Sequence, residues 1–161
     1  MAMAPLIDAY LAGVPAVRQA VADMSRAQLV ARPVTGKWST LEVVCHLADF
    51  EPIYADRMKR IIAEDQPLLF SADEKRFASS LAYQERDIEE ELAIIDQTRR
   101  QLARILRTLP EESFARVGIY RYEGHDEPRT LERFVTLITN HIHHHLKFVY
   151  EKRRALGLTA Q

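Results

Sequence analysis

The sequence has few of the residues that form disulfide bonds or tight β-hairpin turns. Its single cysteine, Cys45, cannot form a disulfide within the chain, and a lone thiol suits a reducing compartment. Only five glycines occur in 161 residues, and neither Asn-Gly nor Asp-Gly is present, so the strongest short hairpin signals are missing. These absences argue against a disulfide-rich fold and against a predominantly β protein.

Long apolar runs and an excess of basic charge are absent as well. No segment approaches the roughly 18 apolar residues that span a membrane, and the opening MAMAPLIDAYLAG has no cationic leader before its apolar residues. Lysine and arginine (22) nearly balance aspartate and glutamate (23), so the electrostatic footprint of a nucleic-acid-binding protein is missing. We expect a soluble, cytoplasmic, single-domain protein over residues 1–161 that binds a small-molecule substrate, with no nucleic acid and no membrane as partner.

Apolar residues recur at helical spacing almost throughout the chain. The first amphipathic stripe covers residues 6–24. Gly13 and Pro15 predict a kink in this helix or a restart near Val14, with Pro15 in a first turn. The stretch RPVTGKW, residues 32–38, is typical of a connecting loop.

A second helix is expected from Ser39 to about residue 64, because Ser39 and Glu42 form an S-x-x-E capping box. Pro52 lies within this pattern and predicts a bend near the preceding turn. The stretch QPLLFSADEKRFASS, residues 66–80, is expected to be an irregular bridge.

The remaining pattern predicts a third helix over residues 83–109, ended by Pro110, and a fourth helix that Thr130 caps and that ends near residue 157. The mixed, polar stretch 111–128 is expected to be a short extended excursion between them. Four long amphipathic helices with unequal connections predict an all-α four-helix bundle, with an irregular or extended excursion between the third and fourth helices.

Four of the six histidines fall within five residues of the predicted fourth helix, in the stretch NHIHHHLKFVYEKRR. At about 100° per residue, His141 and His145 lie in the middle of the apolar stripe of this helix. His144 lies on the flank of the stripe, and His143 points to the opposite, solvent-facing side. Two imidazoles at positions i and i+4 have the spacing that allows both to bind one metal ion. The pair therefore predicts part of a metal site whose third ligand comes from another helix.

The second helix supplies a third imidazole. His46 shares a face with Val43, Phe50 and Ile53, so one histidine again lies in an apolar stripe. The structural alternative for His46 alone is a core histidine bonded to a backbone carbonyl or a carboxylate. Three neutral imidazoles with an open coordination position are typical of a reactive metal site. Zn²⁺ and Ni²⁺ are the first expectations for the ion, with Fe²⁺ and Mn²⁺ as alternatives, since imidazole binds all of them.

Polar residues around these histidines admit two interpretations each. Asp49 is either a solvated edge residue or, as a catalytic candidate, an acceptor that orients His46 or a proton carrier. His144 is the second catalytic candidate, as a group supporting the ligands, a proton shuttle or a substrate contact. Tyr54 and Arg57 fit either the mouth of a pocket or an exposed, ion-paired face.

Cys45 lies about 100° from the face of His46 and is expected to be a small buried hydrophobic residue, neither ligand nor nucleophile. His125 and His143 are expected at the surface. No G-x-S-x-G, G-x-G-x-x-G, Walker or H-E-x-x-H pattern occurs. The three histidines on two helices are therefore the strongest chemical signal in the sequence.

The stretches GKWSTLEVVCHLADFE and TLERFVTLITNHIHHHLKFV resemble the DinB-like superfamily, through a W-[ST]-x-x-E-x-x-x-H element followed by a late H-x-x-H-H element. The resemblance extends from PLIDAYLAG to the end of the last helix. It implies a four-helix bundle, often a homodimer, in a family that includes thiol-dependent transferases acting with bacillithiol or mycothiol. It also implies that His46, His141 and His145 hold the metal. Some members of the family have been labelled metal-dependent hydrolases on fold alone.

Three functional hypotheses follow. The leading one is a metal-dependent thiol S-transferase, with a low-molecular-weight thiol as cosubstrate whose lowered pKa makes it the nucleophile. The second is a metal-dependent hydrolase in which Asp49 or His144 shuttles a proton. The third is a non-enzymatic, metal-binding stress-response module whose ion ties two helices together. A closed structural zinc site would need a fourth protein ligand, for which His144 and His125 are the candidates.

Overall fold

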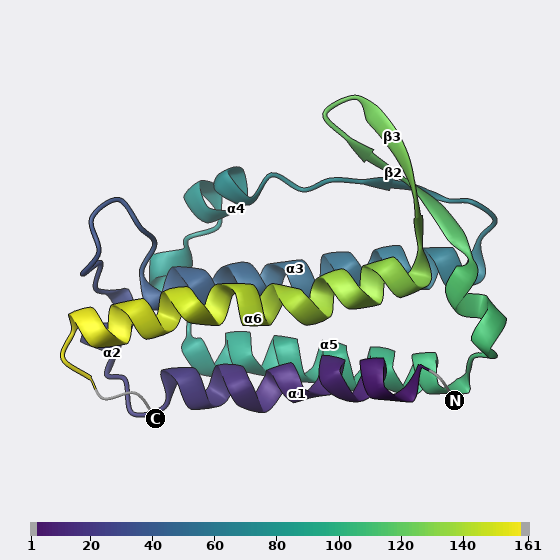
Figure 1. The fold of residues 1–161 in the computed structure, drawn as a ribbon. Helices are drawn as coiled ribbons and strands as arrows, with labels where there is room; N and C mark the ends of the chain where they lie inside the picture. Colours follow the sequence, from purple (N-terminus) through teal and green to yellow (C-terminus); the bar gives the residue numbers. More distant parts are fainter. Residues whose placement is uncertain (1–2, 159–161) are drawn as a thin grey trace.

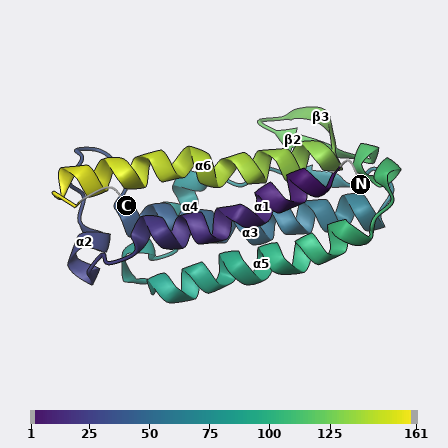
Figure 2. The ribbon, with the colours of Figure 1, turned by 60° about the horizontal axis from the view of Figure 1, so that its bottom comes forward.

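The computed structural model describes residues 3–158, and four long helices form its body (Figure 1). They are α1 (Ala4–Val21), α3 (Thr40–Ala63), α5 (Ile88–Thr108) and α6 (Leu131–Ala155). The packed neighbours are α1 with α6, α6 with α3, α3 with α5, and α5 with α1 (Figure 2). The predicted all-α four-helix bundle is confirmed.

The directions of the helices explain the unequal connections. In Figure 1, α1 and α6 run one way along the bundle, and α3 and α5 run the other way. Because α3 and α5 are parallel, the chain returns along the length of the bundle between them. This return contains β1 (Leu68–Phe70), α4 (Glu74–Ser80) and a 3-10 turn (Tyr83–Glu85), and both α4 and the turn pack on α3.

A small sheet lies beside the end of the bundle where α6 begins. β2 (Val117–Tyr122) pairs in parallel with β1 and antiparallel with β3 (His125–Thr130). The hairpin turns at Glu123 and Gly124, whose φ angles of 49° and 81° are the left-handed combination that matches the twist of the strands. The predicted extended excursion between the third and fourth long helices is therefore confirmed.

Other connections differ from the prediction. The bridge 66–80, expected to be irregular, contains β1 and α4, whose pairing with β2 and packing on α3 come from distant parts of the chain. A short helix, α2 (Arg26–Val30), was not predicted. α5 begins at Ile88 and not at residue 83, because Asp87 accepts hydrogen bonds from two backbone N–H groups of the first turn.

α1 continues through Gly13 and Pro15, so the predicted restart near Val14 is wrong. Gly13 is required for space rather than for a break: a Cβ at this position would clash with the guanidinium of Arg99 and lie 3.0 Å from Cδ1 of Ile142. The glycine therefore lets a buried arginine lie against the backbone of α1.

That arginine links all four long helices. Arg99 of α5 has no exposed surface, and its Nη2 lies 2.5 Å from Oε1 of Glu51 in α3. Its guanidinium also donates to the carbonyls of Tyr10 in α1 and Ile138 in α6. Since a buried charge is tolerated only when paired and hydrogen-bonded, this network fixes how the helices align in the middle of the bundle.

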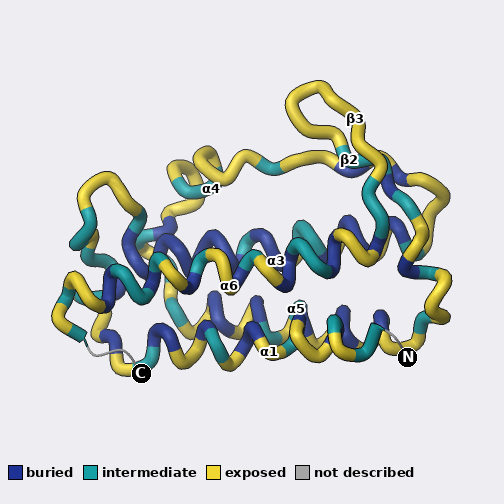
Figure 3. The backbone as a smooth tube through the Cα atoms, in the orientation of Figure 1, coloured by how far each residue is buried: buried dark blue, intermediate teal, exposed yellow. Residues whose placement is uncertain are grey.

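The caps of α3 and α6 follow the sequence prediction and set the phase of the two helices that carry the histidines. Ser39 and Glu42 form the capping box, and the Thr130 side chain accepts a hydrogen bond from the N–H of Arg133 at 3.1 Å. α6 ends before Gly157, whose φ is 72°. Buried residues face inward along all four long helices (Figure 3). Within the described part of the chain, no helix is both long enough and apolar enough to cross a membrane.

Candidate metal centre

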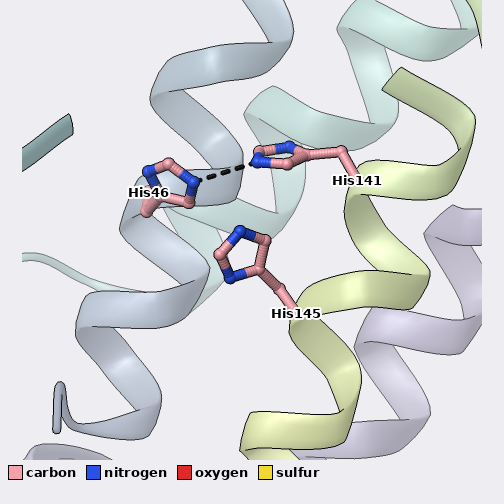
Figure 4. A group of neighbouring side chains, drawn as sticks. All are labelled: His46, His141 and His145. Atoms are coloured by element: carbon pink, nitrogen blue, oxygen red, sulfur yellow. Dashed lines mark hydrogen bonds between the residues drawn. The ribbon is translucent and has the colours of Figure 1, made fainter. Parts of the chain in front are cut away.

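His46 of α3 meets His141 and His145 of α6 where the two helices pack side by side (Figure 4). Nε2 of His46 lies 3.0 Å from Nε2 of His141, and one ring nitrogen of each histidine lies within 4.8 Å of those of the other two. The centroid of the His46 ring lies 4.9 Å from that of His141 and 4.6 Å from that of His145, and the rings of His141 and His145 are 4.7 Å apart. The structure thus brings together the three residues that the sequence predicted as ligands.

The buried stripe of α6 is rotated relative to the prediction. Its buried apolar residues are Leu131, Phe134, Val135, Ile138, Ile142, Leu146 and Val149. On a helical wheel their mean direction lies roughly 85° from His141. His141 and His145 are therefore half-buried at the edge of the core and not in its middle, whereas His46 is buried at 1% exposure. An edge position leaves a route for a small molecule to reach the imidazoles.

Aromatic side chains surround the three histidines. The rings of Phe50 and Trp38 lie 4.4 and 5.3 Å from the ring of His46, centroid to centroid. Tyr54 stacks at 6.3 Å from His141, and Phe148 lies 5.8 Å from His145. These neighbours offer the imidazoles apolar surface in place of water.

The environment keeps the imidazoles neutral. Burial lowers the pKa of His46 to about 4, opposed by the nearby charge of Asp49. Burial, together with the charge of the neighbouring histidines, lowers the pKa of His141 to about 2 and that of His145 to about 3. All three are therefore unprotonated at pH 7, which is the form that binds metal ions.

The chemistry of the three histidines fits a metal ion. Nδ1 of His46, of His141 and of His145 is buried and has no hydrogen-bond partner among the described residues. An unpaired buried nitrogen costs free energy, and three such nitrogens in one place are unusual for a core that needs no ligand. The Nε2 atoms of His46 and His141 lie 3.0 Å apart, close enough to share one divalent ion. Within residues 3–158, no other group of three or more histidine, cysteine or acidic side chains converges in this way.

Comparison with known proteins agrees with this centre. Residues 13–149 match the family model of the DinB superfamily. The chain belongs to the DinB superfamily. It is 32% identical to YfiT of Bacillus subtilis over 145 residues (89% of this chain, 80% of that protein) and 29% identical to a Bacillus licheniformis protein over 141 residues (88% and 79%). Both relatives bear names that make them candidate metal-dependent hydrolases.

The solved structure of YfiT supports the same assignment at the level of the fold. It matches this DinB superfamily member with a TM-score of 0.87 at 28% identity, over 96% of this chain and 87% of that chain. YfiT is described as having an unusual four-helix bundle topology. The family resemblance seen in the sequence is thereby confirmed.

Asp49 has a different partner from the one predicted. Its carboxylate accepts two hydrogen bonds from Arg86, each 3.0 Å long, and Arg86 also donates to Glu91 at 2.8 and 2.7 Å. Asp49 thus belongs to an ion-pair network between α3 and the start of α5. Since Nδ1 of His46 has no partner in the described chain, the prediction that Asp49 orients His46 is wrong. Its role as a proton carrier stays a prediction.

The remaining histidines lie at the surface. His143 and His144 of α6 are exposed, as is His125 at the start of β3. The ring of His144 nevertheless contacts that of His145, with centroids 5.1 Å apart. His144 therefore lies between the triad and solvent, and its role as a proton shuttle stays a prediction.

The structure also shows the environments of Cys45, Tyr54 and Arg57. Cys45 is fully buried, and burial raises the pKa of its thiol to about 12, so it is an inert core residue as predicted. Arg57 is buried at 4% exposure and donates to the carbonyl of Phe70 at 2.6 Å. Its guanidinium lies 5.0 Å from the ring of Tyr54 and 5.2 Å from that of Tyr120. The exposed, ion-paired alternative for Tyr54 and Arg57 is therefore wrong, since the two join the sheet to α3.

A pocket of about 350 Å³ adjoins the triad and was not predicted. It is lined by Gly36, Lys37, Trp38, Val43, Glu74, His144, His145, Phe148 and Lys152. One signal in the sequence points to it: Lys152 follows His145 by seven residues, so both lie on one helical face. Residues 36–38 line the pocket because of the path of the loop before α3, and no pattern in the sequence predicts that path.

Proposed function

We propose that this DinB superfamily member is a metal-dependent S-transferase that joins a low-molecular-weight thiol to an electrophilic small molecule. The observation that carries the proposal is the convergence of three neutral imidazoles at the edge of the core, with Nε2 of His46 and Nε2 of His141 3.0 Å apart. Three protein ligands leave a coordination position for a substrate. The adjoining pocket gives that substrate a place to bind.

His46, His141 and His145 would hold the divalent ion, with Zn²⁺ or Ni²⁺ as first expectations and Fe²⁺ or Mn²⁺ as alternatives. When bound, such an ion lowers the pKa of a thiol or a water molecule that it coordinates. The chain supplies the ligands already unprotonated, because their pKa values lie well below neutral pH. No proton therefore has to leave the histidines for the site to load at pH 7.

The surrounding side chains prepare the thiol for attack. Trp38, Phe50 and Phe148 exclude water from the triad, which strengthens electrostatic interactions there. In a displacement, the sulfur forms a bond to the electrophilic carbon, and the leaving group departs with the bonding electron pair. The thiol proton passes to solvent on the open side of the site, where His144 is exposed next to His145.

Metal-dependent hydrolysis is the second candidate function, and the names of the relatives favour it. Hydrolysis needs a base or proton shuttle close to the triad. The carboxylate of Asp49 is bound by Arg86, which leaves the exposed His144 for this role. We place S-transfer first because a thiol with a lowered pKa is itself the nucleophile and needs no strong base.

Two assays on the same zinc-loaded preparation separate these functions. Conjugation of 2-mercaptoethanol or cysteine with monochlorobimane reports carbon–sulfur bond formation, and p-nitrophenyl acetate reports hydrolysis. We expect conjugation above the uncatalysed rate that falls to background in His141→Ala and persists in His143→Ala, whose side chain is exposed. Ester hydrolysis without conjugation would favour the second candidate. Conjugation that is equal in the two variants would contradict a role for the triad.

A further inference from the structure

The pocket beside the triad contains a buried cation that forms no ion pair with a carboxylate of the described residues. Lys152 of α6 is only 2% exposed, and its Nζ donates to the carbonyl of Phe148 at 3.1 Å. Within residues 3–158, no carboxylate oxygen forms an ion pair with this ammonium. An ammonium held away from water costs free energy, and burial lowers the pKa of Lys152, although the charges of Glu151 and Glu42 partly oppose this shift.

A second cation lines the same pocket from the other side. Lys37 lies in the loop before α3, and its charge lowers the pKa of Lys152 further, so the two ammonium groups repel one another. Like charges gathered around a cavity favour the binding of an anion between them. The exposed Glu74 of α4 also lines the pocket but is not paired with Lys152. Trp38 and Phe148 provide apolar walls.

The pocket also reaches the three histidines. His145 is part of the triad and of the pocket lining, and the ring of Trp38 lies 5.3 Å from that of His46. Lys152 stands about 10 Å along the helix axis from His145, at 1.5 Å per residue. Its side chain reaches back to the carbonyl of Phe148, one turn closer to the triad. A short molecule can therefore have one group at the lysines and another at the histidines.

We propose that this pocket binds a carboxylate of the small-molecule substrate, with Lys152 and Lys37 as its charged partners, while another group of the same molecule lies at the triad. The substrate class is a short, carboxylate-bearing thiol or electrophile. The assignment of the group at the triad rests on the proposed function, whereas the carboxylate pocket rests on the lysines alone. Lys152 and Lys37 then determine which substrates bind.

The only tryptophan of the chain, Trp38, lines the pocket, so its fluorescence reports occupancy directly. Titrations on zinc-loaded protein would use two acid–amide pairs: 3-mercaptopropionate with 3-mercaptopropanamide, and glutarate with glutaramide. We expect the acid of at least one pair to bind about 10-fold to 100-fold more tightly than its amide, because the amide has no negative charge to form an ion pair with either lysine.

Three variants test the assignment to the lysines. Lys152→Met keeps the apolar stem and removes the charge, and Lys37→Gln alters an exposed loop residue that the core does not need. Each should reduce the preference for the acid by about 10-fold. Lys147→Gln removes an exposed charge from the same helix outside the pocket and should leave the preference intact. Equal affinity for acid and amide in the wild-type protein, or a preference that neither lysine variant changes, would overturn the proposal. If Lys152→Met does not fold, Lys37→Gln decides alone.

A failure of the S-transferase proposal gives a different pattern. In that case glutarate still binds in a lysine-dependent manner, but 3-mercaptopropionate binds no more tightly than propionate. The carboxylate pocket then stands and the thiol assignment falls. Zinc content measured on the same samples shows that the lysine variants keep the triad intact.

Discussion

Nε2 of His46 and Nε2 of His141 lie 3.0 Å apart, although 95 residues separate them in the sequence. The capping box of α3 and the cap of α6 at Thr130 set the phase of the two helices. The network of Arg99 ties α3 to α6 at Ile138, one turn before His141. Core packing and buried hydrogen bonds therefore bring the histidines together.

Metal binding should discriminate between neighbouring histidines. His141→Ala removes one of the three converging imidazoles and should abolish stoichiometric zinc binding, since two imidazoles do not make a tight site. His143→Ala is the matched control, because the side chain is exposed two residues away, and it should bind zinc like the wild-type protein. Elemental analysis of gel-filtered protein measures both. Equal zinc content in the two variants would show that the side of α6 that faces the bundle has been assigned wrongly.

Removal of the ion should leave the helices intact. The buried apolar residues of the four long helices provide a core without the metal, so chelation should lower the melting temperature and preserve the helical circular dichroism. The size of the shift depends on ion concentration and affinity. If the ion were a structural tie between α3 and α6, its binding free energy would be folding free energy, and a chelator would unfold the protein. Loss of the helical signal on chelation would thus support the non-enzymatic alternative.

Local rules in the sequence were sufficient to predict the long helices and to single out the three histidines that converge. Capping at Ser39 and Thr130 and the spacing of the histidines depend on residues close in the chain, and they predicted both helices and all three members of the triad. The pairing of Asp49 with Arg86 was not predictable, because Arg86 reaches it only after the chain has returned along the bundle. The rotated buried stripe of α6 has the same cause, since burial on a helix depends on which neighbours cover it.

Arg86 should matter for stability and not for metal binding. Arg86→Gln removes the shared partner of Asp49 and Glu91, two carboxylates that are mostly buried, and should lower the free energy of unfolding by about 1–3 kcal/mol. Zinc content should stay at the wild-type level. Arg76→Gln alters an exposed arginine and should change stability by less than about 0.5 kcal/mol. Urea denaturation measures the free energy of unfolding of both variants. A loss of zinc in Arg86→Gln would instead indicate that Asp49 contributes to metal binding.

The metal-free protein should lose stability as the pH falls below about 6.5. The pKa values of His46, His141 and His145 are about 4, 2 and 3 when folded, so the unfolded chain binds protons that the folded chain does not. The three histidines contribute their full stabilisation when the pH is above their pKa in the unfolded chain. This stabilisation is lost as the pH falls toward their pKa values in the folded protein. Each histidine adds up to about 1.4 kcal/mol per pH unit to the slope.

His141→Gln isolates this effect, because glutamine is polar but does not titrate. The free energy of unfolding of the variant, measured by urea denaturation between pH 8 and pH 5 in the presence of a chelator, should fall less steeply below about pH 6.5 than that of the wild-type protein. Parallel curves for the two proteins would mean that His141 is protonated as readily in the folded state as in the unfolded state.

X-ray absorption spectroscopy of the zinc-loaded protein, recorded with and without 2-mercaptoethanol, detects both the imidazole ligands and a thiol bound to the ion. We expect three imidazole nitrogens at about 2.0–2.1 Å from the ion and, once the thiol is added, one sulfur at about 2.3 Å. Fewer than three imidazoles would contradict the triad of His46, His141 and His145. A zinc environment that gains no sulfur at saturating thiol would contradict S-transfer at this centre.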